Sequence, residues 1–160
     1  MILIALGANL PSPAGPPEAT LRAALESLAA RAIRVEKVSC FYRSAAWPDA
    51  SDPPFVNAVA SIATDLAPAE LLAVLHDVEA EFGRVRGLKN APRTLDLDLI
   101  DYEGRVEHGR VELPHPRVGT RAFVLLPLRD VAPGWRHPVS GKTLPELIAA
   151  VPAAQIEPLP

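Results

Sequence analysis

The amino-acid sequence predicts an α+β fold with a ferredoxin-like βαββαβ core, in which helices pack on an antiparallel sheet. Short runs of β-forming residues alternate with longer segments whose apolar residues recur at helical spacing. Their order along the chain is strand, helix, strand, strand, helix, strand, which is the split βαβ arrangement. The length of 160 residues predicts one domain, 1–160, whose core is followed by a C-terminal extension of short strands and a helix.

The first half of the chain supplies the first four elements. Residues 2–6 are a short apolar run, as expected for a buried strand. Over 18–32 the apolar residues recur at helical spacing, which predicts an amphipathic helix. Residues 33–42 then alternate between apolar and polar, with one slip in register near Lys37, and 55–64 are rich in β-forming residues. Both segments are predicted to be strands.

The second half completes the core and adds the extension. A helix is expected to begin at Pro68, because proline is favoured at the first helical position, and to end near Gly83. Residues 95–100 alternate again and are predicted to form the last core strand. The extension is expected to contain a strand near 106–113, an apolar segment over 122–128 and a short helix near 143–150.

Composition excludes several classes of protein. With 16 basic and 19 acidic residues the formal net charge is −3, so the chain lacks the general positive field on which many nucleic-acid binders depend. Cys40 is the only cysteine, which rules out an intramolecular disulfide and a cysteine-rich zinc site. No apolar run approaches the roughly 18 residues needed to span a bilayer, and the first residues lack the basic region of a signal peptide. We therefore expect a cytoplasmic protein with neither nucleic acid nor membrane among its partners.

The sharpest chemical feature is a pair of aspartates, Asp96 and Asp98, in the last predicted core strand. Side chains alternate between the faces of a strand, so both carboxylates point one way and the flanking leucines point the other way. Neighbouring carboxylates repel each other unless a cation lies between them, and magnesium favours a few carboxylates combined with substrate phosphates. Two such ions, about 3.5–4 Å apart, would fit this pair. The alternative is an edge strand with a solvated acidic face.

Four cations precede the aspartates in the loop that follows the second predicted helix: Arg84, Arg86, Lys89 and Arg93. Arginine forks bind phosphate oxygens in a bidentate manner, so a basic loop beside two acids has the components of a polyphosphate site. Taken alone, the loop could instead be a basic surface paired with acidic residues of the preceding helix. The neighbouring aspartates favour the phosphate interpretation.

A histidine flanked by prolines on both sides, His115, is a further candidate. The prolines restrict the backbone and are expected to hold the imidazole in a fixed direction. Because Arg117 and Arg121 follow closely and Arg110 precedes, we interpret the histidine as an anion or phosphate contact rather than as a structural residue.

An aromatic residue and an amide, Phe55 and Asn57, share one face of their predicted strand. The ring can stack on a flat heterocycle, and the amide can pair with the edge of that heterocycle. Core packing of Phe55 and a hydrogen bond at the start of the strand for Asn57 are the alternatives.

These blocks, in this order, resemble the 6-hydroxymethyl-7,8-dihydropterin pyrophosphokinase family, and the resemblance covers nearly the whole chain. The opening Leu-Gly-Ala-Asn-Leu at 6–10 is similar to the family's Gly-Ser-Asn-Leu, and the most specific block is Pro-Arg-Thr-Leu-Asp-Leu-Asp at 92–98. The other blocks are Phe-Tyr-Arg-Ser at 41–44, Pro-Phe-Val-Asn-Ala-Val at 54–59, Pro-His-Pro-Arg at 114–117 and Arg-Ala-Phe at 121–123. Each block alone is weak, and their common order makes the resemblance specific.

The resemblance implies transfer of pyrophosphate from ATP to the hydroxymethyl group of a reduced pterin, leaving AMP, in folate biosynthesis. The expected partners are these two small molecules, and we expect a monomer. Asp96 and Asp98 would hold two magnesium ions and, with Arg84 and Arg93, would form the catalytic group. ATP contacts would be Glu79, Arg84, Arg86, Lys89, Arg93, Arg110, His115 and Arg121. Pterin contacts would be Ser44, Ala45, Ala46, Phe55, Asn57 and Phe123.

The chain departs from the family in the loop before the last core strand. Many members carry Arg-Trp there, whereas this chain reads Leu-Lys-Asn-Ala at 88–91. We assign Lys89 to the role of the missing arginine. His76 also stands where some members have glutamine. The loops at 45–54 and 83–93 are expected to close over substrate.

Two other functions could use the same fold or residues. A magnesium-dependent phosphohydrolase would use the same aspartate pair. An RNA-binding module can share the ferredoxin-like fold, but it needs exposed aromatic residues on its central strands. The predicted strand 95–100 offers leucines and aspartates instead.

Overall fold

The strands and helices of the computed structural model follow the predicted order, and the structure describes residues 1–46, 49–85, 92–152 and 156–160. The strands are β1 (Ile2–Ala8), β2 (Arg34–Val38), β3 (Tyr42–Ser44), β4 (Phe55–Ala63), β5 (Asp96–Tyr102) and β6 (Ile156–Pro158). The helices are α1 (Pro17–Ala29), α2 (Pro68–Glu81), α3 (Ala122–Val131) and α4 (Leu144–Ala150), with a 3₁₀ turn, η1, over Val118–Thr120.

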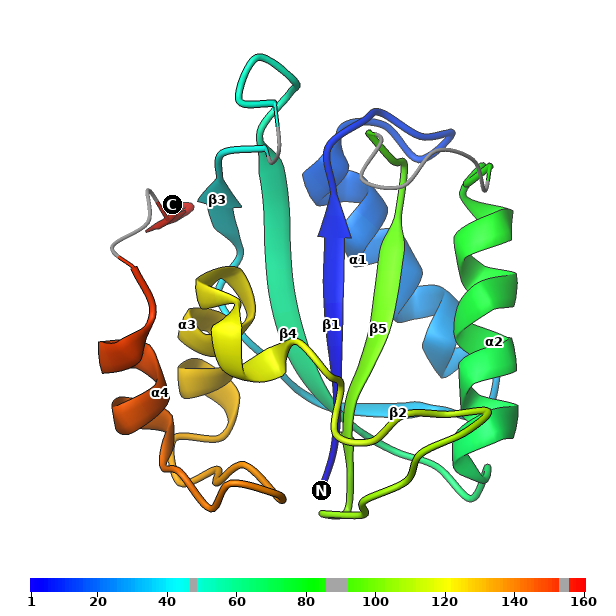
Figure 1. Ribbon diagram of the computed structural model, residues 1–160. Helices are drawn as coiled ribbons and strands as arrows, with labels where there is room; N and C mark the ends of the chain where they lie inside the picture. The colour runs from blue at the N-terminus through cyan, green and yellow to red at the C-terminus, as the bar shows by residue number, and fades with distance from the viewer. Residues whose placement is uncertain (47–48, 86–91, 153–155) are drawn as a thin grey trace.

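The strands form one sheet, and each strand pairing among the described residues is antiparallel. The order across the sheet is β5-β1-β4-β3-β6, and β2 also pairs with β4. The first strand therefore lies between the last core strand and β4, as a ferredoxin-like core requires (Figure 1). The predicted fold class is confirmed.

Helices cover both faces of the sheet, which explains why β1 is buried along its whole length. On one face Ile4 packs with Leu21 of α1 and Leu75 of α2 in a single core cluster. On the other face Leu3 packs with Leu125 of α3 in a second cluster. In the view of Figure 1, α3 and α4 lie in front of the sheet and α1 lies behind it. The apolar run at the start of the chain thus contributes side chains to both cores, because its side chains alternate between the two faces of the sheet.

The segment predicted as one strand over 33–42 is two strands. The expected slip in register is confirmed, since the pairing of β2 with β4 shifts between Val35 and Lys37. Beyond β2 the ladder stops, and the backbone N–H of Cys40 donates to the side chain of Asp130 at 3.1 Å. The chain then joins the sheet again as β3, so a contact with distant α3 replaces part of the expected strand.

The extension differs from the prediction in one place. Residues 106–113 do not form the expected strand, because Glu107 and Leu113 bond to each other in an isolated bridge and the segment folds back on itself. The apolar segment 122–128 lies in α3, and the helix expected near 143–150 is α4. The short strand of the extension is β6, which pairs with β3. No helix in the described part of the chain is long and apolar enough to cross a membrane.

Candidate active site

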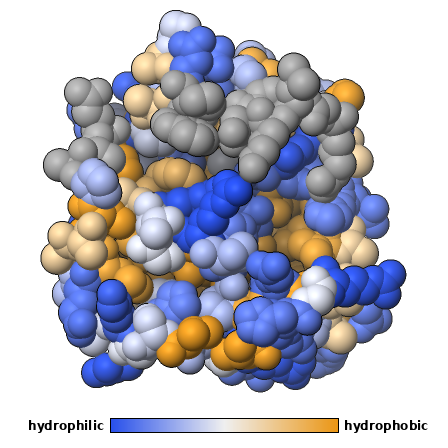
Figure 2. All heavy atoms as spheres, viewed as in Figure 1, coloured by the Kyte–Doolittle hydropathy of each residue, from blue (hydrophilic) through white to orange (hydrophobic). Residues whose placement is uncertain are grey.

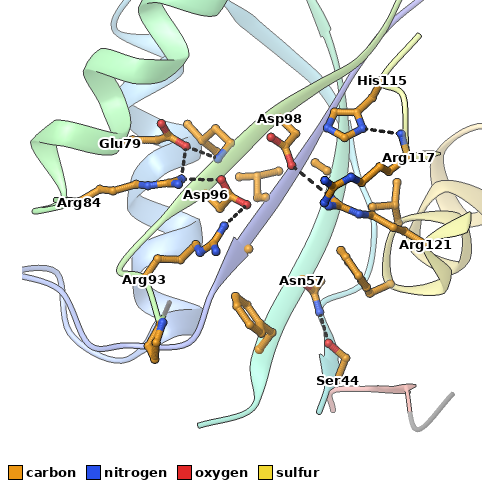
Figure 3. A pocket seen from close by; sticks show the side chains of 18 of the residues that line it. Ser44, Asn57, Glu79, Arg84, Arg93, Asp96, Asp98, His115, Arg117 and Arg121 are labelled. Carbon is orange, nitrogen blue, oxygen red and sulfur yellow. Dashed lines mark hydrogen bonds and ion pairs between the residues drawn. The ribbon is translucent and has the colours of Figure 1, made fainter. Parts of the chain in front are cut away.

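A pocket of about 860 Å³ lies over β1, β4 and β5, on the face of the sheet that also packs against α3. Figure 2 shows hydrophilic side chains gathered at the centre of this face, with apolar side chains around them. The pocket takes its floor from the sheet, one wall from α2 and the loop before β5, and the opposite wall from the loop before α3 and the start of α3 (Figure 3).

The strand register places the polar floor residues in one row. Gly7 of β1 lies opposite Asn57 of β4 and opposite Asp96 of β5, and Ala5 lies opposite Asp98. Residues directly opposite each other in a sheet point to the same face, so both carboxylates and the amide share the pocket floor. A Cβ on Gly7 would lie 3.2 Å from the side-chain oxygen of Asn57. Glycine at this position therefore leaves room for the amide.

Asp96 is held by arginines on both of its carboxylate oxygens. Arg84 Nη1 donates to Oδ1 at 2.5 Å, and Arg93 Nη1 donates to Oδ2 at 3.1 Å. Arg84 Nη1 also lies 2.8 Å from Oε2 of Glu79, which is only 3% exposed. The same oxygen of Glu79 accepts the backbone N–H of Leu97 at 2.8 Å. Glu79 thus joins α2 to the outer edge of β5 and orients Arg84 toward Asp96.

The negative charge of Asp98 has fewer close positive partners than that of Asp96. Among the described residues the ion-pair partner of Asp98 is Arg121, whose Nη1 lies 3.9 Å from Oδ2, too far for a hydrogen bond. Burial, and next the negative charge of Asp96, raise the pKa of Asp98 to about 6, although nearby arginines act in the opposite direction. A partly buried carboxylate whose charge is disfavoured in this way is suited to bind a cation.

His115 is fixed in one tautomer by the chain around it. Its Nδ1 accepts the backbone N–H of Arg117 at 3.1 Å, and its own backbone N–H donates to the carbonyl oxygen of Ile100 on β5. Burial, and next the charge of Arg121, lower the pKa of His115 to about 4. At neutral pH the imidazole is therefore uncharged, and its proton lies on Nε2.

Aromatic and amide groups occupy the other end of the pocket. Phe55 of β4 and Phe123 of α3 both line it, and the ring of Phe123 is 37% exposed although it is a large apolar side chain. The Arg121 guanidinium lies 5.4 Å from the centre of that ring. Asn57 Nδ2 donates to Ser44 Oγ at 2.7 Å, which fixes the amide. Two rings with an oriented amide between them suit a flat, polar-edged heterocycle.

Most of the residues proposed from the sequence come together in this pocket. Those that line it are Ser44, Ala45, Phe55, Asn57, Glu79, Arg84, Arg93, Asp96, Asp98, His115, Arg121 and Phe123. Ala46 is buried and does not line the pocket, and Arg110 is exposed and lies outside the lining. Arg86 and Lys89 lie outside the described residues. The ligand contacts assigned to all of these residues stay predictions.

Several lining residues were not among the candidates. Leu72 and His76 of α2 line the pocket together with Glu79. Their spacing places them on one helical face, so helical periodicity was the available signal. Arg117 and Thr120 also line the pocket. For Arg117 the signal was its place directly after the proline-flanked histidine.

The pocket residues lie in a part of the chain that matches a known family. The sequence model of the 7,8-dihydro-6-hydroxymethylpterin-pyrophosphokinase (HPPK) family matches residues 3–133. The chain belongs to the HPPK family. The matched range contains the whole lining of the pocket.

Similar HPPK proteins occur in several bacteria. A 2-amino-4-hydroxy-6-hydroxymethyldihydropteridine pyrophosphokinase of Pseudomonas aeruginosa is 45% identical over 160 residues, which covers 99% of this chain and 96% of that protein. The protein of the same name from Synechocystis is 42% identical and covers 98% of this chain and 79% of its own length. The one from Methylorubrum extorquens is 40% identical over 96% of this chain.

Solved HPPK structures share the fold. Crystal structures of Plasmodium falciparum HPPK-DHPS superimpose with a TM-score of 0.71 for a triple mutant and 0.70 for the wild type with pteroate, each over 92% of this chain at 12% identity. The chain spans less than half of the length of those proteins, 43% and 41%. At this level of identity the likeness concerns the fold alone.

Proposed function

We propose that the pocket binds ATP and 6-hydroxymethyl-7,8-dihydropterin and transfers the pyrophosphoryl group of ATP to the hydroxymethyl oxygen. As an HPPK the chain is an ATP-dependent pyrophosphokinase of folate biosynthesis. The observation that supports this use of the pocket is that its two ends carry different kinds of side chain. Carboxylates and arginines occupy one end, and two aromatic rings with an amide occupy the other end, on the same face of one sheet.

The aromatic end would receive the pterin. Phe55 and Phe123 would stack on the two faces of the ring, and Asn57, held by Ser44, would pair with its edge. Ala45 lines the same end, where backbone groups of the segment after β3 could add hydrogen bonds. This arrangement would direct the hydroxymethyl group toward the charged end of the pocket.

The charged end would receive the triphosphate with magnesium. Asp96 and Asp98 would hold the metal, and we expect two ions. The donor set fits, because two carboxylates share one face of β5 and the charge of Asp98 is disfavoured until a cation approaches. When bound, magnesium would neutralise phosphate charge and orient the group that moves.

The ion pairs of Asp96 with Arg84 and Arg93 would have to open when ATP binds. The N–H groups of Arg84 and Arg93 that now donate to Asp96 also match phosphate oxygens. A triphosphate would therefore compete with Asp96 for the two guanidinium groups. As they turn to the phosphates, the carboxylate would become available to a cation, so that nucleotide and metal binding favour each other.

The chain's residues would then act by positioning and charge. The new bond joins the hydroxymethyl oxygen to the β-phosphorus of ATP, while the bond from that phosphorus to the oxygen retained by AMP breaks. The proton of the hydroxyl passes to water or to the phosphate of the departing AMP. Such transfers depend on alignment and neutralisation more than on covalent help from the protein. Arg84 and Arg93 would stabilise the charge that moves toward AMP, and Arg121 would contact the phosphate chain from the opposite wall. His115, neutral at pH 7, would donate from Nε2 to a phosphate oxygen without giving up its proton.

The decisive test is an assay for AMP. The protein is mixed with ATP, magnesium and the hydroxymethyl dihydropterin, and AMP is measured against a control without pterin. We expect AMP in amounts equal to the pterin diphosphate formed. Release of ADP or of free phosphate would instead indicate a phosphohydrolase, and no AMP above the control would exclude the transferase function.

The same assay tests the metal clamp. Asp96→Ala and Asp98→Ala are each expected to lower kcat at least 100-fold, because each removes a carboxylate from the cation site. Pterin binding, measured by titration, should stay within about threefold of the original, since the aromatic end is unchanged. Asp77→Ala, which removes an exposed carboxylate of α2 outside the pocket lining, is the matched control. Unfolding of both pocket variants would mean that the pair is structural.

We further propose that the protein acts as a monomer in the cytoplasm, with neither nucleic acid nor membrane as a partner. The formal net charge of −3 does not favour binding to nucleic acid. Sedimentation at micromolar concentration would test the monomer, and a second copy in solution would contradict it.

A further inference from the structure

Two arginines, Arg117 and Arg121, stand on the same wall of the pocket, across from Arg84 and Glu79 (Figure 3). Arg121 is the residue before the first turn of α3, and Arg117 directly precedes η1. Both guanidinium groups belong to residues that line the pocket, so an anion bound between them would be attracted by both.

The pocket arginines differ in how their charges are balanced. Arg84 and Arg93 both pair with Asp96, and Arg121 has Asp98 at 3.9 Å. Within the ranges that the structure describes, Arg117 forms no ion pair. Its hydrogen bonds there involve backbone atoms alone: the N–H donates to His115 Nδ1, and the carbonyl oxygen accepts from Thr120. Its guanidinium is therefore the one cation of the described lining that no carboxylate offsets.

The place of Arg117 indicates which part of the substrates it meets. It belongs to the wall that carries Phe123, whose ring lies 5.4 Å from the guanidinium carbon of Arg121. Phe123 would stack on the pterin, so this wall is the phosphate-binding wall nearer to the acceptor. The pyrophosphoryl group, which passes from ATP to the pterin, would therefore lie beside this wall. AMP would depart from the opposite side of the pocket. His115 lines the same pocket, and with Nδ1 already accepting a hydrogen bond its Nε2–H would be free to donate to the pyrophosphoryl group.

We propose that Arg117 binds the transferred pyrophosphoryl group and holds it both in ATP and in the pterin diphosphate product. This inference rests on the proposed function, because it assigns one more contact to the same reaction. A contact kept from substrate to product contributes to binding in both states and little to the barrier between them. Arg117 is therefore expected to control the affinity for ATP and the release of product more than the chemical step.

The experiment compares five ligands on the intact protein with magnesium present. Dissociation constants are measured by titration for a non-hydrolysable ATP analogue, the pterin diphosphate, inorganic pyrophosphate, AMP and the hydroxymethyl pterin. The variants are Arg117→Ala, Arg117→Lys, which keeps the charge and loses the fork, and Arg129→Ala. Arg129 is an exposed arginine of α3 outside the lining and serves as the matched loss of one charge.

With Arg117→Ala we expect about tenfold weaker binding of the ATP analogue, the pterin diphosphate and pyrophosphate, the size of one charge-assisted contact. AMP and the hydroxymethyl pterin should bind within twofold of the original. Arg117→Lys should recover part of the loss, and Arg129→Ala should change none of the five. An affinity for the hydroxymethyl pterin equal to that of the original protein would show that Arg117→Ala is folded.

Two results would overturn the inference. Unchanged pyrophosphate binding in Arg117→Ala would exclude a contact with this group, and an equal loss for AMP would place Arg117 on the nucleotide. Failure of the proposed function is seen separately, as no AMP from the original protein. If the original protein makes AMP and Arg117→Ala binds pyrophosphate normally, the further inference alone fails.

Discussion

Asp98, which we propose as a metal ligand, is expected to lower the stability of the protein. Its pKa is raised from 3.8 to about 6 because burial, and next Asp96, disfavour the charge. In the unfolded chain the carboxyl loses its proton near its ordinary pKa. Above pH 6 the folded protein must therefore hold a charge that the unfolded chain holds more easily, and this lowers the free energy of unfolding. Such a cost is expected where a site must keep a position for a cation.

Asp98→Asn is accordingly expected to stabilise the protein while it abolishes turnover. At pH 8 without magnesium the free energy of unfolding should rise by about 1–2 kcal/mol, because one pKa unit corresponds to about 1.4 kcal/mol. The gain should shrink as the pH falls from 6 and vanish below pH 4, where the carboxyl is protonated in both states. Urea denaturation at pH 8 and pH 4 measures this, with Asp77→Asn as control. Lower stability of Asp98→Asn at pH 8 would contradict it.

Among the elements, α3 connects the two sides of the aromatic end. Its first turn presents Phe123 to the pocket, and near its last turn Asp130 accepts the Tyr42 hydroxyl at 2.8 Å and the backbone N–H of Cys40 at 3.1 Å. Burial, and next the hydrogen bond to Asp130, raise the pKa of Tyr42 to about 12. Tyr42 begins β3, which ends at Ser44 beside Asn57 in the pocket. One carboxylate outside the site thus fixes the helix against the strand that carries part of it.

Tyr42→Phe tests this role of α3. Loss of the hydroxyl should lower the free energy of unfolding by about 0.5–1.5 kcal/mol. It should also weaken pterin binding about threefold and leave the ATP analogue unaffected, because only the pterin end depends on this contact. Tyr102→Phe is a matched control, since Tyr102 donates its hydroxyl to the carbonyl of Leu66, away from the pocket. Equal pterin affinity in both variants would show that the Tyr42 contact is structural only.

At the scale of the whole molecule, one sheet has an apolar core on each face, and the pocket lies on the face that also packs against α3. The second core depends on the C-terminal half of the chain, which is joined to β5 by a buried hydrogen bond. Trp135 Nε1 donates to Asp101 Oδ2 at 2.8 Å, and the other oxygen of Asp101 accepts the backbone N–H of Gly104. Asp101 is only 4% exposed, so its charge needs these donors.

Trp135→Phe should therefore lower stability without changing catalysis. The ring still fills the core, but Asp101 loses a donor, which should lower the free energy of unfolding by about 1–3 kcal/mol. At 25 °C kcat and KM should stay within twofold, because the bond lies outside the pocket lining. Denaturant unfolding and the AMP assay on the same preparation measure both. A fall in kcat larger than the fraction unfolded would mean that this link also shapes the site.

Local patterns in the sequence were enough for the core elements and for the central chemical feature. The alternation that puts Asp96 and Asp98 on one face depends only on neighbouring residues in one strand, and the structure has it. The shift in register between Val35 and Lys37 is likewise visible in the alternation itself. These features follow from strand geometry, which a short stretch of sequence determines.

The residues that surround Asp96 and Asp98 depend on the tertiary structure. Contact between Cys40 and Asp130, 90 positions apart, divides the segment expected as one strand. Arg110 and Arg117 look alike in the sequence, but only Arg117 lines the pocket. The two aspartates predicted from the sequence as a metal site have unequal partners in the fold: Asp96 lies between two arginines, and Asp98 has no close one among the described residues. Which charges meet depends on distant segments brought together by packing, and no local periodicity records that.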